Sequence, residues 1–214
     1  MVWQTAGYLA GLGIRKAAAG SADKARIRQA MNPRGAMIPQ PLLDIDRVIT
    51  DGHFFQLGVP WGWRDLYPEE QSYAVALAGM PVVAGVVAER ADNDWTSVLV
   101  SPFDMGGESM SSLIMQADEL HKARFSKGQN GRPLGSPGKI LIDGELGLIL
   151  HFGYDVAGAL RGQSSEPVVS LSTTECFFAR LGQGFRVEFG APSRYHERYL
   201  ACLWTMFGSW RWIR

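Results

Sequence analysis

The chain is poor in cysteine, in long apolar runs and in net charge. Its two cysteines, Cys176 and Cys202, are too few for a metal site made mainly of thiolates, or for a small disulfide-stapled secreted scaffold. Both lie in apolar stretches, so we expect buried free thiols. No run reaches the roughly 18 apolar residues that a membrane helix requires, which disfavours a membrane partner. The formal net charge of zero gives no overall attraction to nucleic acid, and we expect no nucleic-acid partner.

The apolar start of the chain, MVWQTAGYLAGLGIRK, differs from a secretory signal in its charge order. A signal carries positive charge before its apolar part, whereas Arg15 and Lys16 follow it here. We therefore expect a cytoplasmic protein. An amphipathic segment lying on a membrane surface, over residues 2–16, remains the alternative.

Few patterns in the chain point to catalysis. The four histidines are scattered without the spacing of a metal-ligand pair, and no Walker loop is present, so we expect no metal and no cofactor. The stretch GESMS (107–111) lies between an expected strand and an expected helix, as a nucleophile elbow does, but Ser111 replaces the second glycine of that turn. A serine hydrolase using Ser109 is therefore kept only as a second alternative.

The positive charge that is present gathers at one end. Residues 1–34 carry six basic side chains against Asp23, a local excess of five, which leaves the rest of the chain acidic. We interpret residues 1–34 as a basic helical arm, with helices over 5–18 and 21–31, residues 35–49 as a proline-rich linker, and residues 50–214 as the compact domain. Short helices need tertiary packing, so the arm must dock on its own domain, on a second copy or on another protein.

Tryptophan is abundant for a chain of this length. Trp61 and Trp63 flank Gly62, and their rings either fill a core or present a surface to a partner, where tryptophan is enriched. Together with the arm they provide the candidate partner-binding residues: Trp3, Tyr8, Leu9, Leu12, Arg15, Lys16, Trp61 and Trp63.

From residue 50 onward the pattern is mostly that of strands. Apolar and β-branched runs predict strands over 53–60, 73–79, 81–89 and 95–103, and two hairpins, one around Asp143-Gly144 and one across 182–184. Apolar residues at helical spacing predict a helix over 108–125. A second helix, over 194–207, is expected to begin with Ser193 as its N-cap and to bury Leu203 and Phe207. This order favours an α+β fold, with an antiparallel sheet covered by helices.

Three of these patterns, in this order, resemble the PsbP-like fold superfamily. They are the stretch FFQLGVPWGWRDL (54–66), the mid-chain helix after a strand, and a closing strand–proline–helix unit that ends in FGSWRW. The superfamily includes LpqN-type lipoproteins and the Eag chaperones of type VI secretion. The resemblance implies an α/β/α sandwich over about residues 50–212 and a role in binding proteins, and it supplies no site motif to transfer.

The function that we expect is therefore a non-catalytic protein-interaction or chaperone-like adaptor domain of a bacterium, with a link to secretion as its extension. Its partner is another protein, or a second copy bound through the N-terminal arm. The first alternative is a small-molecule or lipid-binding domain with an apolar pocket between sheet and helix.

Overall fold

A large antiparallel sheet organises the molecule in the computed structural model, which describes residues 36–89, 96–105, 109–125, 131–156 and 169–213. Among these residues the sheet has eight strands, seven of them in the order β3-β4-β5-β10-β9-β8-β6, with β7 paired to β8. A second sheet has three strands in the order β1-β2-β11. Every pairing between these strands is antiparallel. The predicted α+β class is confirmed.

The elements follow one another as strands with three interspersed helices. The strands are β1 (Ile45–Thr50), β2 (Phe55–Pro60), β3 (Trp63–Asp65), β4 (Ala84–Ala88), β5 (Ser97–Asp104), β6 (Arg132–Pro133), β7 (Gly138–Ile142), β8 (Glu145–Val156), β9 (Val169–Arg180), β10 (Gln183–Pro192) and β11 (Arg211–Trp212). The helices are α3 (Pro68–Ala78), α4 (Met110–Phe125) and α5 (His196–Ser209).

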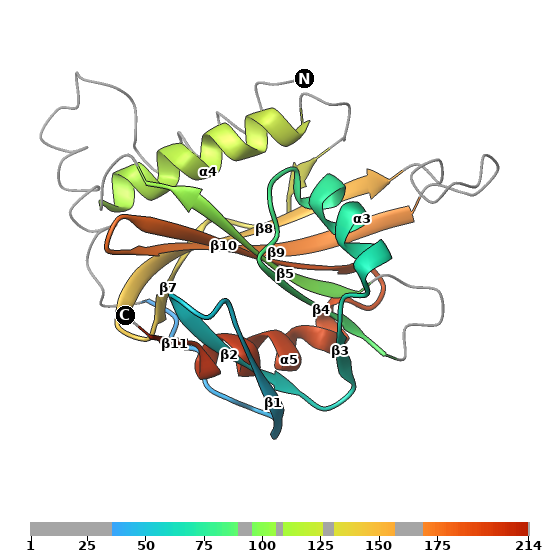
Figure 1. Ribbon diagram of the computed structural model, residues 1–214. Helices are drawn as coiled ribbons and strands as arrows, with labels where there is room; N and C mark the ends of the chain where they lie inside the picture. The colour runs from blue at the N-terminus through green and yellow to red at the C-terminus, as the bar shows by residue number, and fades with distance from the viewer. Residues whose placement is uncertain (1–35, 90–95, 106–108, 126–130, 157–168, 214) are drawn as a thin grey trace, which may run out of the picture.

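The helices cover both faces of the large sheet (Figure 1). On one face, α3 and α4 enclose a core that includes Leu113, Ala117 and Phe177. On the other face, α5 and β2 enclose a second core that includes Leu203, Phe207 and Trp210. These residues are at most 4% exposed, so the apolar faces predicted for the two longer helices are confirmed as buried. None of the described helices is long and apolar enough to span a membrane.

Tight turns join the longest strands of the large sheet. Asp143 and Gly144 both have positive φ, of 45° and 87°, as a two-residue turn between twisted strands requires. The turn between β9 and β10 is formed in the same way by Leu181 and Gly182, at φ of 52° and 80°. It therefore comes earlier than the turn predicted over residues 182–184, because β10 already begins at Gln183.

Two sequence predictions about helices are wrong. Residues 73–79, predicted as a strand, belong mostly to α3, which Pro68 starts in its first turn and Gly79 ends in a left-handed conformation. Ser193 is not the N-cap of α5: that helix starts at His196, and the Ser193 hydroxyl instead accepts a hydrogen bond from Ser172.

Residues 36–49, predicted as linker, lie against the domain. Met37 exchanges backbone hydrogen bonds with the β7 region, and the amides of Leu42 and Leu43 both donate to the Thr205 hydroxyl on α5. At Gly208 a Cβ atom would come within 2.8 Å of residues 40 and 41, so glycine permits this close crossing. Residues 45–49 form most of β1, so this part of the predicted linker pairs with β2.

Candidate peptide-binding groove

The structure separates the two tryptophans proposed for partner binding. Trp61 is 72% exposed at the turn between β2 and β3, whereas Trp63 is 2% exposed and packs edge-on against Tyr199. The indole of Trp63 is therefore a core side chain and is removed from the candidate surface. The other candidates, Trp3, Tyr8, Leu9, Leu12, Arg15 and Lys16, lie outside the described residues.

Strand β1 presents an open edge. It is the end strand of the small sheet, and within the described ranges no strand pairs with its outer side. In an antiparallel pair, alternate N–H and C=O groups of an edge strand point away from the neighbour and can bind another extended segment. The outward-facing Val48 of this strand is also exposed.

A groove runs between β1 and the edge of the large sheet. It has a volume of about 230 Å³ and is lined by Ile49, Thr50, Asp65, Leu66, Gln71 and residues 82–85. The groove lies where β3 ends: the pairing of β3 with β4 covers Val86–Ala88, and the Leu66 amide continues it by donating to the Gly85 carbonyl at 3.3 Å. The edge of β1 and residues 82–85 thus border the same hollow.

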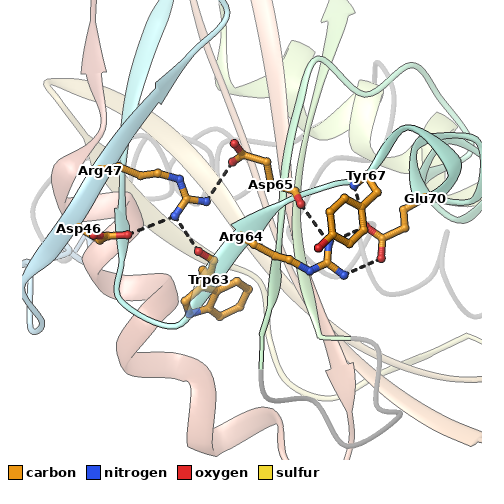
Figure 2. A network of polar contacts seen from close by, with 7 residues as sticks. All are labelled: Asp46, Arg47, Trp63, Arg64, Asp65, Tyr67 and Glu70. Carbon is orange, nitrogen blue, oxygen red and sulfur yellow. Dashed lines mark hydrogen bonds and ion pairs between the residues drawn. The ribbon is translucent and has the colours of Figure 1, made fainter.

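Arg47 holds the two sides of this hollow at a fixed separation. Its guanidinium donates to the Trp63 carbonyl at 2.6 Å and to Asp65 Oδ1 at 3.0 Å, and it lies 3.4 Å from Asp46 Oδ2. Figure 2 shows this side chain reaching from β1 to β3. The arginine therefore closes the gap between the two sheets beside residue 47, and the groove opens two residues further along, at Ile49.

A second arginine orients α3, which provides one wall of the groove. Arg64 binds both carboxylate oxygens of Glu70 at 2.7 Å and lies over the Tyr67 ring (Figure 2). Glu70 Oε2 also accepts the Tyr67 amide at 2.8 Å, as the acidic member of a capping box does. The hydrogen bonds from Arg64 and then the Tyr67 amide lower the pKa of Glu70, so this carboxylate stays charged at neutral pH. The arrangement fixes the position of Gln71.

The surroundings of the groove are acidic. Residues 44–70, which contain β1, β2, β3 and the start of α3, carry six carboxylates against Arg47 and Arg64, a net charge of −4. Asp65 lines the groove, and its side chain is 67% exposed despite the bond to Arg47. A positively charged segment is therefore the electrostatic complement of this surface.

Two other polar clusters lie inside the fold. Under α4, the buried His121 contacts Glu175 at 2.8 Å, and Arg186 contacts both Glu175 and Glu188. All four side chains are at most 3% exposed, which places them beyond the reach of a substrate. They place His121, one of the four scattered histidines, in the core.

Near the start of α5, the other cluster brings together two histidines that are far apart in the sequence. The Thr174 hydroxyl bonds His151 Nδ1 at 2.9 Å and His196 Nε2 at 3.1 Å. Burial, and then the proximity of His151, lower the pKa of His196 to about 4. Among the described residues no group of three or more potential ligands could hold a metal ion.

Ser109, the candidate nucleophile, occupies a capping position. Its hydroxyl accepts the amide of Ser112 at 3.1 Å and lies 3.0 Å from the Ser112 hydroxyl, just before α4. These are the contacts of an N-cap serine.

The groove itself was not predicted from the sequence. Its walls come from β1, β3, α3 and β4, and only tertiary packing brings these segments together. The sequence contains one signal for it: residues 44–70 carry six carboxylates, whereas residues 1–34 are basic.

Comparisons with known proteins identify the fold. No protein-family model matches the chain, and no curated protein matches it in sequence. The solution structure of cyanobacterial PsbP from Synechocystis is similar, with a TM-score of 0.50 and 11% identity, over 78% of this chain and 91% of that one. LpqN, involved in cell envelope biogenesis of Mycobacterium tuberculosis, has a TM-score of 0.47 and 13% identity, over 74% and 82%. The chain has a PsbP-like fold, which confirms the resemblance.

Proposed function

We propose that this PsbP-like chain is a non-catalytic protein-binding domain that takes an extended segment of another protein along the outer edge of β1. The observation that carries the proposal is the open edge of β1 beside a groove whose other side is formed by residues 82–85. Such an arrangement suits strand addition, in which main-chain hydrogen bonds provide affinity and adjoining pockets select side chains.

Apolar side chains around the groove support this role. Val83 lines it and is 45% exposed, Val82 and Ile49 line it as well, and Trp61 is exposed after Pro60, which pairs with the Ile45 end of β1. A bound segment would remove these surfaces from water, at about 25 cal/mol for each Å² of apolar area. Trp61 would act as a rigid aromatic anchor at the end of such an interface.

Features elsewhere in the fold favour a non-catalytic role. The ionisable cluster around Glu175 is sealed beneath α4, and the Ser109 hydroxyl is engaged with Ser112 as a cap. The space between the large sheet and α5 is filled by side chains such as Phe178, Phe189 and Trp210, where a small-molecule or lipid pocket had been an alternative. More specifically, we propose that the protein is a chaperone or adaptor linked to secretion and acts in a bacterial cytoplasm.

Site-specific photo-crosslinking in the native host tests the proposal. A Val83→benzoylphenylalanine variant places the reactive group in the groove, and Met115→benzoylphenylalanine places it on the exposed side of α4, on the other face of the large sheet from α5. We expect a discrete covalent adduct with another protein from position 83 and none from position 115. The proposal would be overturned by equal adducts from both positions, or by no intermolecular adduct from position 83.

A further inference from the structure

The acidic groove and the basic N-terminal segment belong to the same chain. Residues 1–34 carry a net charge of +5, and residues 44–70, around the groove, carry −4. Each charge is concentrated rather than spread along the chain, so the two segments attract one another most strongly at low ionic strength. Residues 1–34 also include apolar side chains, among them Trp3, Leu9 and Leu12, that match the exposed Val83 in the groove.

The chain between the two segments is fixed on the domain. Met37 is held by its backbone bonds to Lys139 and Leu141, and residues 42 and 43 are held on Thr205. The N-terminal segment therefore starts from a defined point on the surface. A fully extended chain of about 34 residues reaches roughly 110 Å, several times the radius of gyration of about 17 Å expected for a domain of this size. The groove lies well within that reach.

Attachment to the domain favours the chain's own segment over a second copy. A segment tethered by a short connection has an effective concentration in the millimolar range. The segment of a separate copy reaches this concentration only when the protein itself is present at millimolar concentration. Opposite charge, sufficient chain length and covalent attachment all favour contact between residues 1–34 and the groove of the same chain.

We propose that residues 1–34 cover the groove of their own domain, with basic side chains beside Asp65 and apolar side chains on Val83 and Ile49. The proposal rests on the groove being a binding site, as inferred above. The N-terminal segment is then an internal competitor, and a partner gains the β1 edge by displacing it. Arg47 bonds Asp46, Asp65 and the Trp63 carbonyl. The side chain of Asp65 is 67% exposed despite this bond, so its outer part is accessible to the N-terminal segment.

Hydrogen exchange followed by mass spectrometry, on the purified full-length chain, tests the proposal. An Arg15→Glu/Lys16→Glu variant reverses charge in the segment, and Gln71→Lys places a positive charge in the lining of the groove without breaking the bond between Arg47 and Asp65. We expect amides of residues 45–50 and 82–85 to exchange about tenfold faster in either variant than in the wild type. Combining all three substitutions restores the opposite charges and should recover most of the protection.

A matched charge reversal on the far face provides the control. Glu119→Lys changes an exposed carboxylate of α4, whose side chain is 73% exposed, and should leave exchange in residues 45–50 unchanged. Wild-type protection should also fall in 1 M salt, where the Debye length is about 3 Å. Exchange that is indifferent to the Arg15 and Lys16 changes would overturn the proposal.

The concentration dependence identifies the source of the segment. We expect the same protection at every protein concentration and a monomeric mass by sedimentation. Protection that appears only together with a dimer would assign the groove to the segment of a second copy and overturn the proposal. Hydrogen exchange is measured on the purified chain without a partner. A negative result therefore overturns the covering of the groove by residues 1–34 and leaves the proposed function to be decided by crosslinking.

Discussion

The Ser209 hydroxyl, at the end of α5, bonds both backbone groups of Gly58 in β2. It accepts the Gly58 amide at 2.9 Å, and its one proton lies within reach of the Met206 carbonyl at 2.8 Å and the Gly58 carbonyl at 3.2 Å. Strand β11 pairs with β2 only at Phe55 and Gln56, so the serine continues the pairing where β11 stops. This side of the small sheet is thereby closed, which leaves β1 as its open edge.

Ser209→Ala should reduce the free energy of unfolding by about 1–3 kcal/mol, because it leaves a partly buried amide without its acceptor. Urea unfolding followed by tryptophan fluorescence measures the change. Ser136→Ala, in an exposed loop, provides the control and should have little effect. Equal stabilities of the two variants would show that the Gly58 amide finds another acceptor.

Arg186→Met should reduce the free energy of unfolding by about 3–5 kcal/mol, because it leaves the buried carboxylates of Glu175 and Glu188 without their common cation. Adding Glu188→Leu removes one of these charges and should recover part of the loss. Chemical denaturation of the two variants provides the comparison. A double variant less stable than Arg186→Met alone would contradict this account of the network.

Acid should destabilise the protein through His196. Burial and His151 lower the pKa of His196 from 6.5 to about 4. Between pH 6.5 and pH 4 the unfolded chain therefore binds a proton at this histidine and the folded chain does not. Stability is therefore fully present above about pH 6.5 and falls as the pH drops toward 4. His196→Gln should show a weaker loss over this interval in urea titrations, and His53→Gln, at an exposed position, should show the wild-type loss. Identical acid profiles for all three proteins would refute the assignment.

Arg47→Met should loosen β1 without unfolding the domain. An exposed ion pair contributes about 1 kcal/mol or less, so the midpoint of unfolding should change little. Amide exchange in residues 45–50 should nevertheless become faster, because the bonds from this arginine to Trp63 and Asp65 are lost. Arg132→Met, which removes a longer contact to Asp155, should leave β1 unchanged. If exchange in β1 stays at the wild-type rate, Arg47 does not hold the groove.

Local pattern predicted much of the fold. The Asp143-Gly144 turn and the helical spacing of Leu113 and Ala117 depend on neighbouring residues, and the structure confirms both. The run at residues 73–79 was mistaken for a strand because short apolar runs suit either structure. The residues that identify this run as helix are Pro68 and Glu69, which begin α3, and Gly79, which ends it.

The site depended on information that the sequence pattern does not carry. Trp61 and Trp63 have the same local context, yet one is in solvent and the other in the core, because Trp61 lies in the turn after β2, where Gly62 has a φ of 83°, whereas Trp63 begins β3 and packs against Tyr199. Arg186, Glu188 and Glu175 interrupt apolar strands, which was a visible signal of a buried polar network. The open edge of β1 follows only from the order of strands in the small sheet.

The central claim, that this domain binds another protein through the groove, is tested most directly by quantitative affinity purification from the native host. The wild-type chain is compared with Val83→Glu, in the groove, and with Met115→Glu, at an exposed apolar residue of α4. We predict one stoichiometric protein partner with the wild type and with Met115→Glu, and its loss with Val83→Glu while the variant remains folded. A partner retained by Val83→Glu at the wild-type ratio would contradict the account.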